Sequence, residues 1–225
     1  VQAADFVQNG NYLTVQLKQH QNYGPSQIRL QVVSDRIIRV QATAEQSFRS
    51  KQSLIIVPQN SKAQYKVEEQ GDDLIITTAA MRAVLNEATG QITFYDLKDQ
   101  VLLKEVAQGG KTFKPFTVPD REIGVDIAKV PEAQKHGWSW RALFDSPDNE
   151  AFYGLGQHQS EELNMKGKNE DLFQYNTKVS VPFVISNKNY GILWDSYSYS
   201  RWGNPDDYLQ LNRAFKLYDK DGKEG

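Results

Sequence analysis

Apolar and polar residues alternate along most of the first half of the chain. Between residues 12 and 18 the apolar positions are Leu13, Val15 and Leu17, and polar residues fill the positions between them. Successive side chains of a β-strand point to opposite faces, so this period of two predicts strands with one face on a core and the other in water. The same period recurs in residues 28–32, 38–40, 74–76, 81–85 and 92–94.

Turn-forming residues separate these alternating segments. Asn9-Gly10, Gly71-Asp72-Asp73 and the stretch from Asn86 to Gly90 are examples, and their spacing is that expected of a β-sandwich or barrel. No amphipathic helical pattern extends beyond about two turns. The sequence therefore predicts an all-β fold.

The second half keeps the strand pattern but is richer in aromatic residues. Of the 25 aromatic residues, 14 lie between Trp138 and Tyr208, and these include all four tryptophans. Residues 157–170 are polar and predict a long loop. The predicted strands are Trp138–Phe144, Val181–Ser186 and Tyr190–Ser196, the last two joined by a hairpin connection at Asn187-Lys188-Asn189.

Charge and composition exclude several classes of partner. The chain has 225 residues and a formal net charge of −2, with its Lys and Arg scattered among Asp and Glu. Nucleic-acid-binding domains need a basic patch, so no nucleic-acid partner is expected. No apolar run approaches the roughly 18 residues of a membrane span. The absence of cysteine rules out disulfides and thiolate metal sites.

The two ends of the sequence suggest processing at one end and continuation at the other. The start, Val1-Gln2-Ala3-Ala4, fits a mature chain after signal-peptide cleavage, and a chain trimmed at this point fits equally well. Of the two we expect export, which would place the protein in the periplasm or outside the cell. Residues 1–225 read as one domain, and residues 219–225 read as a junction to a following module.

No motif in the sequence is typical of a complete active site. Phosphate-binding loops, serine-hydrolase elbows and zinc motifs are missing, so we expect neither a metal nor a cofactor. His158 is either a proton carrier or a hydrogen-bonded structural histidine, and the structural role is favoured. Glycosidic hydrolysis needs two carboxylates across the bond. The candidate carboxylates are Asp145, Asp148, Glu161, Glu162, Asp195, Asp206 and Asp207.

Two further features have both a functional and a structural interpretation. Gly154-Leu155-Gly156 is a poor nucleotide loop, and we interpret its glycines as positions where positive φ angles or close backbone approach are needed. The second feature is an aromatic band that either stacks on sugar rings or packs in a core or interface, with packing favoured. Its members are Trp194, Tyr197, Tyr199, Trp202 and Tyr208.

From residue 152 onward the sequence resembles glycoside hydrolase family 31. Residues 152–158, Phe-Tyr-Gly-Leu-Gly-Gln-His, are similar to a Tyr-Gly-Leu-Gly-Glu-His stretch in the N-terminal domain of its α-glucosidases and α-xylosidases, with Gln157 where many members carry Glu. Three more similarities follow in the family's order, over about 45 residues in all. They lie at Asn164–Lys168 with Gln174–Thr177, at Val181–Ser186 and at Asn189–Ser196.

The resemblance implies a galactose-mutarotase-like β-sandwich that precedes a catalytic (β/α)₈ barrel. In this family the barrel supplies both catalytic aspartates. The motif that holds the nucleophilic aspartate includes a following methionine, and neither Met81 nor Met165 of this chain lies in such a motif. It therefore implies no catalytic residue in this chain, whose partners would be its own barrel and an oligosaccharide substrate. A loop at Tyr175, Asn176 and Thr177 would contact the −1 sugar. The implied whole enzyme is a retaining α-glycosidase, with an α-xylosidase acting on xyloglucan oligosaccharides favoured.

Three other interpretations stay open at this point. The first is a stand-alone carbohydrate-binding module that uses the aromatic band. The second is an aldose-mutarotase-like enzyme with His158 and Glu161 as its acid and base. The third is a structural clamp between domains.

Overall fold

The computed structural model describes eight stretches of the chain, residues 6–18, 22–49, 52–57, 63–108, 110–117, 127–158, 162–174 and 176–203. Tyr175 and the predicted junction at residues 219–225 lie outside these stretches. The chain forms two compact units, Val1–Phe113 with Trp140–Asp148, and Lys114–Ser139 with Asn149–Gly225. The single domain expected over residues 1–225 stays a prediction.

The first unit begins with a four-stranded antiparallel sheet, in the order β1-β2-β3-β4. Leu13 pairs with Leu30 and Val15 with Ile28, so the alternating apolar residues of neighbouring strands share one face. The predicted alternation is confirmed here. The strands are β1 (Phe6–Asn9), β2 (Tyr12–Gln16), β3 (Gln27–Ser34) and β4 (Ile37–Thr43).

A five-stranded antiparallel meander, β5 to β9, forms the second sheet of this unit. Leu74 pairs with Leu85 and Leu85 with Ile92, which again aligns the apolar positions on one face. The strands are β5 (Tyr65–Gln70), β6 (Asp73–Thr78), β7 (Arg82–Asn86), β8 (Ile92–Tyr95) and β9 (Val101–Lys104).

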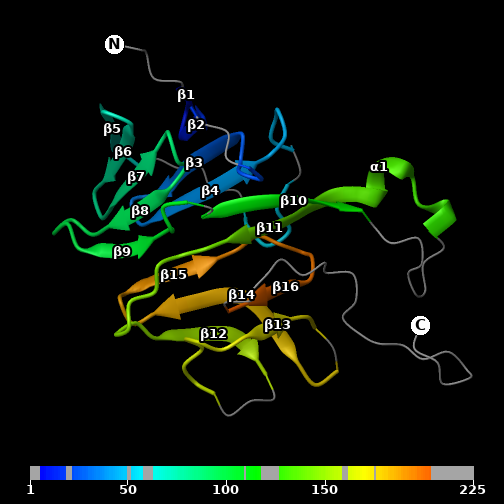
Figure 1. The fold of residues 1–225 in the computed structure, drawn as a ribbon. Helices are drawn as coiled ribbons and strands as arrows, with labels where there is room; N and C mark the ends of the chain where they lie inside the picture. Colours follow the sequence, from blue (N-terminus) through cyan, green and yellow to red (C-terminus); the bar gives the residue numbers. More distant parts are fainter. Residues whose placement is uncertain are drawn as a thin grey trace, which may run out of the picture. The chain divides into compact units, whose positions relative to one another are not determined.

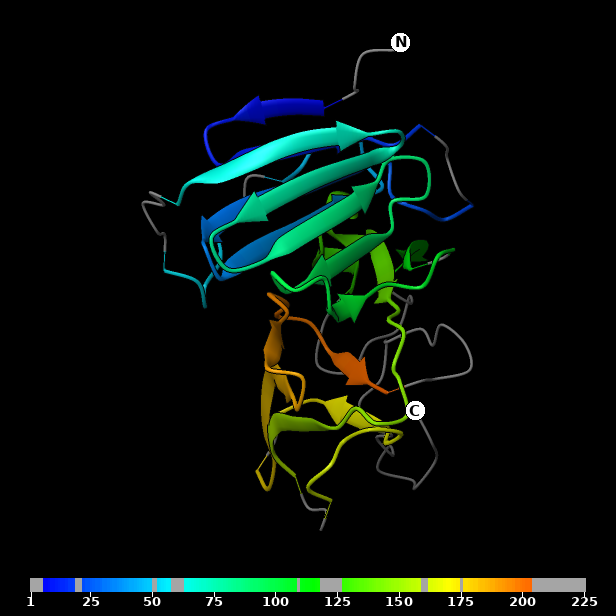
Figure 2. The same cartoon turned by 90° about the vertical axis from the view of Figure 1, so that its left-hand side faces the viewer.

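The apolar faces of these two sheets meet in one core, which makes the first unit a β-sandwich. Figure 2 shows the two layers. Each fully buried aliphatic side chain contributes about 1.5–3 kcal/mol to stability, so this core is the main source of the unit's stability. The buried members are Leu13, Val15, Leu17, Ile28, Leu30, Val32, Leu74, Ile76, Leu85 and Ile92.

Strands β10 (Lys111–Thr117) and β11 (His136–Ala142) form a two-stranded ribbon, and the boundary between the units falls within both strands. The helices among the described residues are short, η1 (Ile127–Lys129) and α1 (Glu132–Lys135). This agrees with the expectation that no long amphipathic helix is present.

The second unit contains the segments that resemble the glycosidase family (Figure 1). It has a three-stranded antiparallel sheet in the order β12-β14-β15 and a pair formed by β13 and β16. Its buried core is Phe152, Leu155, Met165, Leu172 and Val184. The strands are β12 (Phe152–Gln157), β13 (Glu170–Leu172), β14 (Val179–Ser186), β15 (Tyr190–Leu193) and β16 (Ser200–Trp202).

The predicted hairpin is confirmed, because Ser186 pairs with Tyr190 across the turn and Asn189 has a φ of 65°. Strand β15 ends at Leu193, three residues earlier than predicted. Beyond Leu193 the backbone N–H of Ser196 donates to the carbonyl of Trp194 at 3.0 Å. This tight local turn takes the chain out of the ladder.

Candidate functional site

The predicted sugar-contacting residues Asn176 and Thr177 lie in an exposed turn directly before Lys178 and β14. Tyr175, the third of them, falls outside the described stretches. Because β14 is the central strand of its sheet, this turn leads directly into a strand that is paired on both sides. Sugar contact by these residues stays a prediction.

A bulge in β12 carries the Gly-Leu-Gly motif. Gly154, Leu155 and Gly156 have φ angles of 133°, 68° and 98°, and the pairing of β12 with β14 shifts register between the two glycines. A Cβ on Gly156 would lie 2.1 Å from the carbonyl oxygen of Val179. The predicted need for positive φ and close backbone approach is confirmed. The bulge turns Leu155 into the core, where it is fully buried.

A cluster of three charged or titratable side chains lies at the end of the β12–β14 ladder, and the sequence analysis missed it as a group. Glu170 forms an ion pair with Lys178, and its Oε1 lies 3.1 Å from Nδ1 of His158. The Nε2 of His158 contacts the carbonyl oxygen of Leu155 at 2.7 Å. The favoured interpretation of His158 as a hydrogen-bonded structural residue is confirmed.

Three of the candidate carboxylates within the described stretches, Asp145, Glu162 and Asp195, have partners at or near the surface. Asp145 lies 3.6 Å from the ammonium of Lys104, and Glu162 lies 2.6 Å from that of Lys168. These contacts are typical of surface ion pairs. Asp195 accepts a 2.7 Å hydrogen bond from the hydroxyl of Tyr197, within the same turn, and Asp148 is exposed. Glu161, Asp206 and Asp207 lie outside the described stretches.

Two tryptophans of the aromatic band pack against the core of the second unit. Trp194 and Trp202 stack with their ring centroids 6.2 Å apart, and Phe152 meets Trp202 edge-on at 5.2 Å. The packing interpretation is confirmed for these two residues, which removes the centre of the surface that a stand-alone sugar-binding module would need. Tyr197 is exposed, and Tyr208 lies outside the described part.

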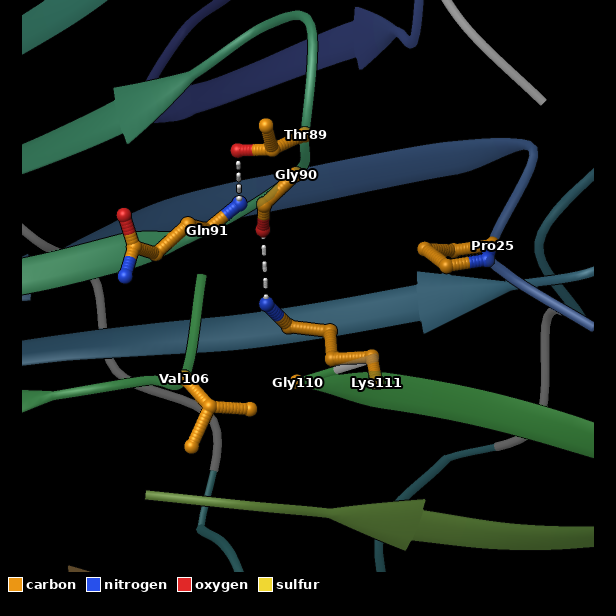
Figure 3. A pocket seen from close by; sticks show the side chains of 7 residues that line it. All are labelled: Pro25, Thr89, Gly90, Gln91, Val106, Gly110 and Lys111. Carbon is orange, nitrogen blue, oxygen red and sulfur yellow. Dashed lines mark hydrogen bonds between the residues drawn. The ribbon is translucent and has the colours of Figure 1, made fainter. Parts of the chain in front are cut away.

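In the first unit a small pocket lies beside a buried ion pair, whose lysine is one of the lining residues. Its lining includes Gly90, Gln91 and Lys111 (Figure 3). The ammonium of Lys111 forms an ion pair with Glu105 and donates to the carbonyl of Gly90 at 3.1 Å. Burial raises the pKa of Glu105 and lowers that of Lys111, and their mutual attraction opposes both shifts. The pair ties β10 to the residue that follows β9, and the hydrogen bond to Gly90 ties it to the loop before β8.

Within the stretches that the structure describes, no cluster of three or more His, Asp or Glu side chains could hold a metal ion. In the same stretches, no helix is long and apolar enough to cross a membrane.

Residues 27–202 match the model of a family described as the glycosyl hydrolase 31 N-terminal galactose mutarotase-like domain. A crystal structure of a GH31 α-xylosidase from Xanthomonas citri superposes with a TM-score of 0.74 at 37% identity, covering 100% of this chain and 22% of that one. These matches confirm the all-β, galactose-mutarotase-like fold and the family resemblance.

Two curated relatives match the same region. An uncharacterized family 31 glucosidase of Pseudescherichia vulneris is 27% identical over 178 residues, covering 75% of this chain and 32% of that protein. An α-xylosidase of Saccharolobus solfataricus is 25% identical over 185 residues, covering 78% and 23%. The chain spans less than a third of the length of each relative.

Proposed function

This chain belongs to the glycosyl hydrolase 31 N-terminal galactose mutarotase-like family, and from that premise we propose that it is the non-catalytic N-terminal domain of a retaining α-glycosidase. It supports the catalytic barrel of that enzyme and contributes the turn at Asn176 and Thr177 to the −1 sugar site. The proposed substrates are xyloglucan oligosaccharides from which the whole enzyme releases α-linked xylose. Two of the matched proteins bear the name α-xylosidase, which supports this specificity.

The observation that carries the proposal is the exposed apolar face of the β12-β14-β15 sheet. On β14 this face presents Val179, Val181, Phe183 and Ile185, which are 37–49% exposed, while Val184 on the opposite face is fully buried. Strands with apolar side chains on both faces are typically covered on both. The row is therefore suited to contact with another protein layer.

Neighbouring strands extend this row into a patch. Tyr153 pairs with Ile185 and Leu193 pairs with Phe183, so both side chains lie on the face of β14 that carries the row. Both are 40% exposed or more. We assign the catalytic barrel as the layer that covers this patch, because each of the relatives that the chain matches is more than twice its length.

A single strand joins the patch to the candidate sugar-binding turn. Strand β14 starts at Val179, one residue after Lys178, and the turn at Asn176 and Thr177 precedes it directly. Docking of β14 on the barrel would therefore fix the position of the turn relative to the catalytic groups. Placement of this kind lowers the barrier of a reaction by restricting the motion of the bound substrate.

Substitution of Asn176 tests whether the turn contacts the sugar. In the full-length enzyme, Asn176→Ala should lower kcat/KM for an aryl α-xyloside by about 10- to 100-fold, because a polar contact to the sugar is lost in a water-poor site. The melting temperature should stay unchanged, since the side chain is exposed. Gln70→Ala, an exposed change in the first unit, serves as the matched control. Unchanged kinetics in Asn176→Ala would favour the structural clamp instead.

The docking patch has its own matched pair of variants. Ile185 is 49% exposed on the patch, and Ile37 is 55% exposed on β4. Ile185→Asp should destabilise the full-length enzyme by about 2 kcal/mol or more, because it buries a carboxylate against the barrel. Ile37→Asp should stay within about 0.5 kcal/mol of the parent. Equally small effects of the two changes would mean that the barrel does not cover the patch.

A further inference from the structure

Three side chains from three separate strand ends converge beside the turn at Asn176 and Thr177. His158 follows β12, Glu170 begins β13, and Lys178 precedes β14. Their side chains are 5%, 15% and 11% exposed, respectively. The carboxylate of Glu170 contacts both the ammonium of Lys178 and Nδ1 of His158, so one acidic group joins the two basic ones.

Strand register places this cluster at the open end of the sheet. Gln157 pairs with Val179 as the last rung of the β12–β14 ladder. His158 and Lys178 are the next residues beyond that rung. Lys178 is also the residue directly after Thr177, so the cluster holds the chain at the point where the turn enters β14.

The glycine-flanked bulge holds the imidazole of His158 in place. Its Nε2 lies 2.7 Å from the carbonyl oxygen of Leu155. A carbonyl only accepts, so Nε2 carries the hydrogen. The buried Nδ1 then points toward Glu170, 3.1 Å away, without the geometry of a hydrogen bond. Because Leu155 is itself fixed in the core, the bulge holds the ring with Nδ1 beside the carboxylate.

The other end of the turn segment is also anchored. Phe173 packs edge-on against Tyr199 with the ring centroids 6.2 Å apart. Asp171 accepts a 2.7 Å contact from Nε of Arg201 on β16. The segment between β13 and β14 is therefore held at its start by packing and at its end by the buried charges.

We infer that His158, Glu170 and Lys178 are positioning residues that set the geometry of the turn at Asn176 and Thr177 for sugar binding. The inference rests on the proposed function of that turn. None of the three needs to touch the substrate. Their effect would pass through Asn176, because the cluster fixes the backbone two residues away from it.

The decisive experiment is a double-mutant cycle in the full-length enzyme. Glu170→Gln keeps the shape of the side chain but removes the negative charge that pairs with Lys178. It should lower kcat/KM for an aryl α-xyloside by about 10- to 100-fold, since misplacement of a contact by about 1 Å can cost up to about 100-fold. In an Asn176→Ala background the same change should have little further effect, because coupled residues are not additive.

Glu162→Gln is the matched control. Glu162 also pairs with a lysine, Lys168, but both side chains are almost half exposed, so activity should stay at the parental level. Lys178→Met should lower activity as much as Glu170→Gln does. Lys178→Arg keeps the positive charge and should retain most of the parental activity. These variants keep the inference testable if Glu170→Gln does not fold.

The possible outcomes separate the inference from the proposed function. Full activity in both Glu170→Gln and Lys178→Met, with Asn176→Ala impaired, would overturn the inference and leave the turn's role intact. Losses that multiply in the double variant would also overturn it, because they would show that the cluster acts independently of Asn176. An unimpaired Asn176→Ala would count against the proposed function itself.

Discussion

The phenol hydroxyl of Tyr190 donates a 2.6 Å hydrogen bond to the carboxylate of Glu150. That carboxylate belongs to a residue only 3% exposed, and it also accepts a 2.5 Å hydrogen bond from the hydroxyl of Ser186. Burial and the hydrogen bond to Glu150 raise the pKa of Tyr190 well above its usual value of 10.0. The phenol therefore remains a donor at every pH at which the protein would be handled, and the buried charge keeps both partners.

Removal of this donor should be costly. Tyr190→Phe should lower the free energy of unfolding by about 1.5–3 kcal/mol, the range for a hydrogen bond to a charged group. Urea denaturation followed by circular dichroism would measure it. Tyr197→Phe is the control, because its hydroxyl also contacts a carboxylate, Asp195, but at the exposed surface. It should stay within about 0.5 kcal/mol of the parent; equal losses in both variants would contradict the role of burial.

Gly156 should tolerate no side chain. Gly156→Ala places a methyl group 2.1 Å from the carbonyl oxygen of Val179 at a φ of 98°, and should lower the free energy of unfolding by about 3 kcal/mol or more. Gly167→Ala is the comparison, since its φ is 71° but no atom lies within 4 Å of the added group. In Gly167→Ala the loss should be limited to the cost of the left-handed backbone conformation, about 1–2 kcal/mol. Similar losses in the two denaturation curves would mean that β14 can move away from the bulge.

The buried pair of Glu105 and Lys111 should act as a unit. Lys111→Met leaves a carboxylate buried without its cation and should destabilise the chain by about 3–5 kcal/mol. The double change Glu105→Gln with Lys111→Met should cost less than the sum of the single changes, with a coupling of about 0.5–3 kcal/mol. Arg49→Met, which breaks an exposed pair with Glu45, should shift the unfolding midpoint very little. Additive losses at Glu105 and Lys111 would contradict a direct pairing.

Ionisation of Tyr199 should lower the stability of the chain at alkaline pH. Burial, followed by the hydrogen bond to Asp171, raises the pKa of Tyr199 from 10.0 to about 12. The folded state therefore holds this proton more tightly than the unfolded state. Its contribution to stability is complete below pH 10 and is lost as the pH rises through about 12.

Comparison with Tyr199→Phe isolates this titration. The difference in unfolding free energy between parent and variant should shrink between pH 10 and pH 12. An ultraviolet titration should show one late-ionising tyrosine more in the parent than in the variant, which keeps Tyr190. Tyr23→Phe, at an exposed tyrosine of the first unit, controls for the loss of a phenol. A constant difference across that pH range would contradict the shift.

Strict alternation made the sheets of the first unit predictable, because a period of two places Leu13, Leu30 and Leu85 on core-facing sides whatever the details of packing. The hairpin at residues 187–189 and the special backbone of Gly154 and Gly156 were equally visible, since each depends on local residue types. These predictions needed no information about distant parts of the chain.

The charge cluster was not predictable in the same way. His158, Glu170 and Lys178 are separated by 12 and 8 positions in the sequence. The register of β12 with β14 brings His158 near Lys178, and the position of β13 adds Glu170. The sequence pattern also could not decide between core packing and sugar stacking for Trp194 and Trp202, because both uses favour the same residue type. The boundary between the two compact units falls inside β10 and β11, so each of these strands continues across it without a break.

The bulge in β12 limits how the two strands can slide past each other. A regular ladder can shift by two residues and keep its inward and outward faces, but here Gly154 and Gly156 each lie where the partner backbone leaves no space for a Cβ. A shift by two residues would bring Phe152 or His158, which have side chains, into one of those places. The register of β12 with β14 is thus fixed by the absence of a side chain at Gly154 and Gly156 as well as by the hydrogen bonds between the strands.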